Sequence, residues 1–360
     1  MPRSGRSQFR TVLFRRGPVP RPLVSGGAVG DALSGVCARV TERNTVIVVG
    51  GEALVDLVPE NERTESGLAA LVPRLGGAAC NVAVALGRLG ADAALLSRLS
   101  TDAFGRALLR RLSSSGVDTS LLQRGDEPTS LAVVNPVENG VEYTFHVHGC
   151  ADRRVVDPGP LESAHAVSLG GLSLVLEPGA SAYESVMRRE SHRGSLIALD
   201  PNIRDPLIDD AAAYRARFEN WLPNVDLLKL SAEDAQWLVG DSARDPVGAA
   251  REWVTMGPSA VLVTHGGAGM SVVLRDGGRV DVSVPSSTVV DTIGAGDTVQ
   301  AAVLAWLARN DVLSGSAVAA LGTEQWRAVL RFAASSAAVT CSRPGAEPPH
   351  AAELDELASC

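Results

Sequence analysis

The protein has 360 residues, of which 45% are hydrophobic and 21% charged, and its formal net charge is −8. The length alone predicts about two domains with ample core. The acidic balance argues against nucleic acid as the main partner. No apolar run approaches the roughly 20 residues of a membrane span. We therefore expect neither a nucleic-acid nor a membrane partner.

Lysine and cysteine usage excludes several kinds of site. Lys229 is the single lysine, so the chain has no G-x-x-x-x-G-K-[ST] motif and no P-loop nucleotide site. The cysteines are few and widely spaced, and no C-x-x-C occurs. This pattern is typical of a reduced cytosol and not of a disulfide framework or a zinc site. We expect a cytoplasmic protein.

Residues 1–44 differ from the rest of the chain. They hold eight arginines against Asp31 and Glu42, are rich in Pro, Gly and Ser, and lack the apolar segment of a secretory signal. The composition fits a disordered extension, residues upstream of the native start, or an organelle transit peptide. We expect a disordered extension over 1–44 and one folded domain over 45–360.

The folded part begins with alternating strand and helix patterns. Residues 46–49 form an apolar run closed by two glycines, which predicts a buried strand. Helical spacing follows over 81–89, and a second strand fits 93–96. The next helix starts after Thr101 or Asp102, either of which can cap it.

A different pattern surrounds Asn139-Gly140, which is a strong two-residue hairpin signal. After it, apolar side chains such as Tyr143 and Phe145 alternate with polar ones such as Glu142 and Thr144. This alternation predicts a half-exposed antiparallel ribbon inside an otherwise α/β protein.

From residue 164 onward, apolar strands alternate with helices. Such repeated strand–helix order predicts a mostly parallel sheet covered on both faces. Ligands of these sheets bind at the carboxyl ends of the strands. Two segments, "DLLKLS" and "VLVTHG", end there in polar or glycine residues.

The stretch "DTIGAGD" joins a glycine turn to a helix start. Gly294 and Gly296 leave the backbone N–H groups free, and a helix start carries about half a positive charge. Together they predict an anion hole, with the carboxylate of Asp297 beside it as a general base. Two alternatives stay open from this stretch alone: Asp297 as an N-cap, and a dinucleotide turn, although Val299 stands where that motif needs glycine.

The stretch beginning "GGAACN", together with "DTIGAGD", resembles the ribokinase-like (PfkB) family of sugar kinases, in order and with normal spacing from about residue 46 to 350. The resemblance implies a mostly parallel twisted sheet flanked by helices on both faces, with a small β-sheet lid from about 57–75 and 129–148. It implies a base at Asp297 and an anion hole at Gly294, Ala295 and Gly296. The implied sugar-binding residues are Asp56, Gly76, Gly77 and Asn81.

Two arginines are further candidates for the sugar site. Arg153 follows the ribbon in "VHGCADR", and Arg204 ends the strand segment "DPNIR". Either could instead be a solvated side chain or part of a loop salt bridge. Behind Asp297, Thr298-Val299 replaces the Ala-Phe that is usual in the family, and the sequence offers no reason for this change.

Two further matches imply the nucleotide side of the site. "KLSAED" resembles the segment that organises Mg²⁺ and phosphate, but Ser231 stands where the family often has asparagine. "VTHGGAG" resembles the glycine turn under the ATP phosphates, and its alternative is an ordinary hairpin. The candidate nucleotide-binding residues are Lys229, Ser231, Thr264, Gly266, Gly269 and Gly296. Asp234 is the candidate Mg²⁺ ligand, and Asp291 lies near a potential site for K⁺.

These features predict an ATP-dependent sugar kinase that phosphorylates a hydroxymethyl group, most similar to bacterial fructokinases. A 2-keto-3-deoxygluconate kinase, whose substrate carboxylate would face Arg204 or Arg153, is the alternative, and a ribokinase fits less well. From another class, the chain could be a non-catalytic relative with a regulatory role. We also expect a homodimer formed through the exposed ribbon of the lid.

Overall fold

The computed structural model describes residues 46–63, 69–137 and 140–358. The first 45 residues, including the predicted extension, and Asn139 of the predicted turn lie outside them. The strands are β1 (Val46–Gly50), β2 (Leu54–Arg63), β3 (Ala69–Gly76), β4 (Ala93–Ser100), β5 (Leu122–Gly125), β6 (Leu131–Val137), β7 (Gly140–His146), β8 (Ala164–Gly170), β9 (Leu196–Asp200), β10 (Leu227–Ser231), β11 (Ala260–Thr264), β12 (Met270–Leu274) and β13 (Arg279–Val282).

The α-helices alternate with many of these strands. They are α1 (Ala78–Arg88), α2 (Ala103–Ser114), α3 (Gly179–Arg193), α4 (Ala211–Trp221), α5 (Ala232–Val239), α6 (Pro246–Trp253), α7 (Ala295–Arg309), α8 (Gly315–Ala319), α9 (Thr323–Cys341) and α10 (Ala351–Ala358). In the described residues, no helix is both long and apolar enough to cross a bilayer.

Nine strands form the large sheet in the order β13-β12-β11-β10-β9-β8-β1-β4-β5. The pairs from β11 through β5 are parallel, and β12 and β13 are antiparallel additions at one edge. The predicted mostly parallel sheet is confirmed. Strand β8 ends at Gly170, and a short 3₁₀ turn follows it.

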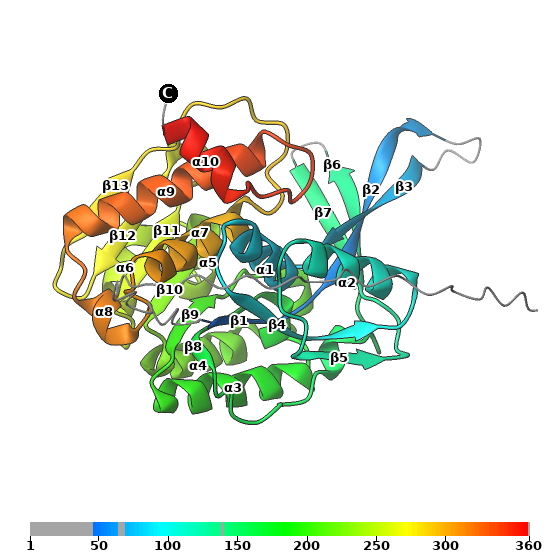
Figure 1. Cartoon of the computed structure of the whole chain (residues 1–360), viewed down its shortest axis with the longest axis horizontal. Helices are drawn as coiled ribbons and strands as arrows, with labels where there is room; N and C mark the ends of the chain where they lie inside the picture. The colour runs from blue at the N-terminus through cyan, green and yellow to red at the C-terminus, as the bar shows by residue number, and fades with distance from the viewer. Residues whose placement is uncertain (1–45, 64–68, 138–139, 359–360) are drawn as a thin grey trace, which may run out of the picture. The chain divides into compact units, whose positions relative to one another are not determined.

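Both faces of the sheet are covered, as the apolar strands require. Successive residues of β1 point to opposite faces: Ile47 belongs to the core beneath α1, α7 and α9, and Val48 belongs to the core beneath α3, α4 and α6. Figure 1 shows α1, α7 and α9 on one side of β1 and β8, and α3 and α4 on the other.

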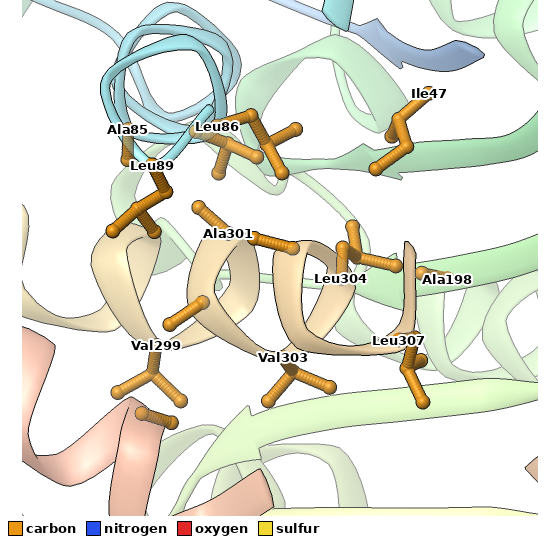
Figure 2. Packing of buried hydrophobic residues seen from close by; sticks show 14 of the residues in the cluster. Ile47, Ala85, Leu86, Leu89, Ala198, Val299, Ala301, Val303, Leu304 and Leu307 are labelled. Atoms are coloured by element: carbon orange, nitrogen blue, oxygen red, sulfur yellow. The ribbon is translucent and has the colours of Figure 1, made fainter. Parts of the chain in front are cut away.

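Helix α7 lies in the middle of the first core. Figure 2 shows Ala301 of α7 facing Leu86 and Leu89 of α1, while Leu304 lies nearer Ile47 and Ala198 of the sheet. These side chains are all almost fully buried. Close packing of this kind fixes the helix and therefore fixes the turn at its N-terminus.

A separate four-stranded sheet has the order β3-β2-β6-β7. Its β6 and β7 form an antiparallel hairpin in which Val137 pairs with Gly140. Tyr143 and Phe145 are partly buried and stack at 5.8 Å between ring centroids, whereas Glu142 and Thr144 are exposed. Figure 1 shows this sheet standing to one side of the large one.

Candidate active site

A cavity of about 390 Å³ opens between the small sheet and the carboxyl ends of the large-sheet strands. Its volume is within the range of about 300–1,000 Å³ that is usual for small-molecule sites. Nine of the residues predicted from the sequence line it: Asp56, Gly77, Asn81, Arg204, Lys229, Asp291, Gly294, Gly296 and Asp297. Segments far apart in the chain therefore meet at one site.

Asp297 lies in the first turn of α7 and is only 8% exposed. Its Oδ2 accepts a hydrogen bond of 2.9 Å from Asn81 Nδ2 in α1. Burial raises the pKa of Asp297 above the ordinary range of a carboxyl, while the bond from Asn81 and the charge of Lys229 oppose the rise. A carboxylate with a raised pKa is a better proton acceptor, as a general base requires.

The turn before Asp297 is a glycine turn that leaves the start of α7 without a side-chain cap. Gly294 is the N-cap of α7, with φ 76°, and no side chain caps this helix start. A Cβ on Gly294 would lie 2.6 Å from the Cβ of Ala346, so both the dihedral angle and the space favour glycine. The geometry argues against the interpretation of Asp297 as a simple N-cap.

Lys229 supplies a positive charge beneath this turn. A Cβ on Gly296 would lie 3.0 Å from Lys229 Nζ, so the ammonium approaches the backbone of the turn. Lys229 is buried, and its Nζ bonds Asp200 Oδ2 at 2.5 Å. Burial lowers the pKa of the ammonium, but Asp200 outweighs this effect and the net pKa is raised. Lys229 is therefore a fixed cation in the cavity wall.

Asp56 lies across the cavity, on β2 of the small sheet. Burial raises its pKa to about 6, against the lowering effect of Arg204. A Cβ on Gly76 would lie 2.3 Å from Asp56 Oδ2, so the glycine leaves room for this carboxylate. A deprotonated carboxylate in this place can accept bonds from the hydroxyl groups of a ligand.

Glu52 is a cavity residue that the sequence analysis did not select. It follows β1, is buried, and its carboxylate accepts bonds from Ala78 N (3.1 Å) and Ser173 Oγ (2.6 Å). It therefore links the start of α1 to the turn after β8. The sequence does contain a signal for this residue. Glu52 directly follows a buried strand and two glycines, and ligands bind at the ends of such strands.

Arg204 lines the cavity and is held by its own loop. Its Nη1 donates to Asn202 Oδ1 at 2.6 Å and to Ile203 O at 2.9 Å. Asn202, which belongs to the same "DPNIR" segment, has a left-handed φ of 45°, which is uncommon for a residue other than glycine. This loop therefore places a second cation in the cavity wall, where its charge opposes the rise in the pKa of Asp56.

Other predicted residues lie outside the lining of this cavity. Arg153 donates to Glu177 O at 2.7 Å and lines a separate small hollow. Thr264 ends β11, and the predicted glycine turn at Gly266 and Gly269 joins β11 to β12. The turn therefore lies in an antiparallel hairpin, which was the alternative interpretation of this segment. Its role under the ATP phosphates stays a prediction.

Ser231 and Asp234 form a capping box at the start of α5. One oxygen of Asp234 accepts from Ser231 N at 3.2 Å and the other from Ile203 N at 2.9 Å. The carboxylate therefore connects α5 to the loop that carries Arg204. Both oxygens already hold a backbone donor, which favours contact with a metal through water over direct ligation.

Asp291 joins two loops at the mouth of the cavity. Its oxygens accept from Ile293 N at 3.0 Å and from Gly345 N at 2.8 Å. The same two loops approach each other at Gly294, where an added Cβ would lie 2.6 Å from the Cβ of Ala346. Across the described ranges, no three His, Cys, Asp or Glu side chains gather as a metal cage. The residues present fit a Mg²⁺ ion held mainly by phosphate oxygens and water.

The sequence pattern of the pfkB family carbohydrate kinases matches residues 44–352. A fructokinase of Rhizobium leguminosarum bv. trifolii is 35% identical over 287 residues, which cover 78% of this chain and 86% of the relative. Fructokinase-2 of Oryza sativa subsp. japonica is 30% identical over 338 residues, which cover 90% and 97%. The solved structure of fructokinase with bound ATP from Xylella fastidiosa has a TM-score of 0.79 at 25% identity, covering 88% of this chain and 100% of that one.

The fold is ribokinase-like, and the similarity to these kinases identifies an enzyme that transfers a phosphoryl group from ATP to a carbohydrate. The chain belongs to the pfkB family of carbohydrate kinases. The resemblance inferred from "GGAACN" and "DTIGAGD", and the mostly parallel fold that it implied, are confirmed.

Proposed function

We propose that the protein is a fructokinase, which transfers the γ-phosphoryl group of ATP to a hydroxymethyl group of fructose. The observation that carries the chemistry is the buried carboxylate of Asp297, next to the open helix start of α7 and inside a cavity lined by polar groups. The choice of fructose is supported by the relatives named fructokinase.

In this proposal the sugar lies between Asp56 and the start of α1, with Gly76, Gly77 and Asn81 beside it. The reacting hydroxyl points at Asp297, which takes its proton as the oxygen bonds to the γ-phosphorus. The bond from that phosphorus to the bridging oxygen of ADP breaks at the same step. Positioning and electrostatics supply most of the acceleration in such reactions.

The positive groups around the turn have a defined task in this mechanism. The N–H groups of Gly294, Ala295 and Gly296 and the ammonium of Lys229 stabilise the charge on the transferring group. Bound Mg²⁺ would neutralise charge on the nucleotide phosphates, and Asp234 would reach it through water. The segments of Ser231, Thr264, Gly266 and Gly269 are proposed to face the nucleotide.

The small sheet is proposed to act as a lid. Its Tyr143 and Phe145 line the cavity together with Asp56. Closing over the sugar would exclude water and so suppress hydrolysis of ATP. The stacked aromatic pair gives the lid an apolar inner surface for the carbon face of a sugar.

A second candidate substrate is 2-keto-3-deoxygluconate, and Arg204 is the observation that favours it. The guanidinium lies in the cavity wall and could pair with the carboxylate of this sugar acid. Arg153 lies outside that lining, so Arg204 is the better candidate of the two.

An assay of ADP release with fructose, 2-keto-3-deoxygluconate and ribose tests the proposal. We expect the highest kcat/KM with fructose and, for Arg204→Met, a loss of less than about tenfold with that sugar. Activity with the sugar acid alone, abolished by Arg204→Met, would replace fructose by the second candidate. If no sugar is turned over and calorimetry detects no binding of ATP, a non-catalytic role replaces both.

Further expectations concern ions and assembly. We propose dependence on Mg²⁺, stimulation by K⁺ bound near Asp291, and a cytoplasmic location. We also propose a homodimer through the lid, in which β3 and β7 are the edge strands. Leu71 and Val137 of this sheet are 44% and 43% exposed, as a contact surface between two copies would require.

A further inference from the structure

A second and much smaller cavity adjoins Asp297 on the side of the large sheet. Its volume is about 20 Å³, and it is lined by Asp297, Asn202, Ser168, Asp200 and Gln300 among others. A cavity of roughly 10–15 Å³ accommodates one water molecule when two to four polar groups surround it. Both conditions are met here.

Gln300 is the residue that distinguishes this cavity. It lies three residues after Asp297 in α7, on the same side of the helix, and it is only 1% exposed. Its Nε2 donates to Ser168 Oγ at 3.3 Å. Its Oε1 has no hydrogen-bond partner among the residues that the structure describes, although buried acceptors are nearly always paired.

A second acceptor without a partner lines the same cavity. Asp200 is 6% exposed, and its Oδ2 accepts from Lys229 Nζ. Its Oδ1, like Gln300 Oε1, finds no donor in the described part of the chain. Water has two donors and can satisfy both oxygens at once, which no single protein donor in the lining does.

We propose that this cavity binds one ordered water molecule, which donates hydrogen bonds to Gln300 Oε1 and Asp200 Oδ1 and accepts one from Asp297 when that residue is protonated. The inference rests on the proposed role of Asp297 as base. After phosphoryl transfer, the proton on Asp297 passes to the water, and the water gives one of its own protons to Asp200 Oδ1. Asp297 is thereby a carboxylate again while the sugar phosphate is still bound.

The surroundings of Asp200 suit a temporary proton acceptor. Burial raises its pKa to about 6, and Lys229 opposes the rise. The ammonium stays protonated throughout, so the pair gains and loses one proton only. The charged groups that face Asp297 and Asp200 are Lys229 from β10, Arg204 from the loop after β9, Glu52 from the turn after β1, Asp234 from α5 and Asp56 from β2.

Gln300 is then a positioning residue, and two variants of α7 test this role. Gln300→Met keeps the length and removes the polar atoms, so we expect kcat to fall about tenfold with KM for fructose and ATP unchanged, a fraction of the usual contribution of acid–base catalysis. We also expect kcat to decrease less steeply below about pH 6, because Asp200 no longer accepts the proton.

Thr298→Val is the matched control. Thr298 is equally buried in α7, but its Oγ1 bonds Thr340 Oγ1 in α9 at 2.9 Å and does not line the cavity. We expect its kcat to stay within about twofold of the wild type and its pH profile to be unchanged. If Gln300→Met behaves like Thr298→Val, the relay is wrong.

A crystal structure of the wild-type protein tests the water site itself without turnover. We expect density for one water about 2.7–3.2 Å from both Gln300 Oε1 and Asp200 Oδ1, and its loss in Gln300→Met. An empty cavity, or an ion in its place, would overturn the proposal. If the water is present but no sugar is phosphorylated, the site stands and the proposed function fails, so the two failures are distinguishable.

Discussion

Asp102 and Asp297 both stand at the start of a helix, and their surroundings differ in every respect that matters for chemistry. Asp102 is the N-cap of α2, and its carboxylate accepts from Gly105 N at 2.7 Å and from both N and Oγ1 of Thr129 at 2.9 and 2.8 Å. Asp297 lies inside α7, where Gly294 is the cap, and accepts only from Asn81 in the described contacts.

The two pKa values move in opposite directions for this reason. Burial raises the pKa of both carboxyls, but the bonds to Asp102 from Gly105 and Thr129 outweigh burial, so its net pKa is lowered. Burial prevails at Asp297. An aspartate that accepts several hydrogen bonds is a stable anion and can stabilise a helix. An aspartate in a cavity that accepts only one hydrogen bond can bind a proton.

The largest effect is expected for Asp297→Asn. The amide keeps the shape but cannot accept the proton, so kcat should fall at least about a hundredfold, while sugar affinity by calorimetry should change little. The same substitution at Asp102, where the residue only caps a helix, should leave kcat within about twofold. Near-normal turnover of Asp297→Asn would rule out this residue as the base.

This contrast also shows what the sequence could and could not predict. "DTIGAGD" identified the turn, the carboxylate and the helix, because glycine and apolar spacing act locally. It left the choice between cap and base open, because that choice depends on Asn81, which is 216 positions away in the chain. Glu52 and Gln300 were missed for the same reason: the hydrogen-bond partners of each lie far away in the chain.

The second prediction concerns pH. In the proposed mechanism Asp297 and Asp56 act as carboxylates, and both have a raised pKa, which for Asp56 is about 6. Activity is therefore present above these values and is lost as pH falls through them. We expect kcat/KM for fructose to drop about tenfold or more per pH unit below about pH 6, well above the usual range of an aspartate.

The variant Asp56→Asn sharpens this prediction. It should raise KM for fructose about tenfold, since hydrogen bonds to a charged group are lost, and it should leave a shallower acid limb, from which one titrating group is missing. A profile that stays flat down to about pH 4.5 in the wild type would contradict the raised pKa values at this site.

The third prediction compares two glycines of similar conformation. Gly294 has φ 76° and Gly90 has φ 80°, but a Cβ on Gly90 meets no atom within 4 Å, whereas one on Gly294 meets Ala346. Both alanine variants should lose about 1 kcal/mol of stability to the left-handed backbone. Only Gly294→Ala should also lower kcat, by about tenfold, because the N–H groups of the proposed anion hole shift. Equal kcat in the two variants would show that the turn does not need its present geometry.

The smallest effect is expected for Asp102, whose loss should affect stability and not activity, in contrast to Asp297. Asp102→Ala should lower the free energy of unfolding by about 1 kcal/mol, or Tm by about 2 °C in a domain of this size, with kcat unchanged. Because the pKa of Asp102 is lowered in the folded state, its contribution is present at neutral pH and is lost as pH falls through the folded-state value. The stability difference between wild type and Asp102→Ala should therefore shrink in acid. A difference that grows instead would mean that the carboxylate at α2 does not act as a helix cap.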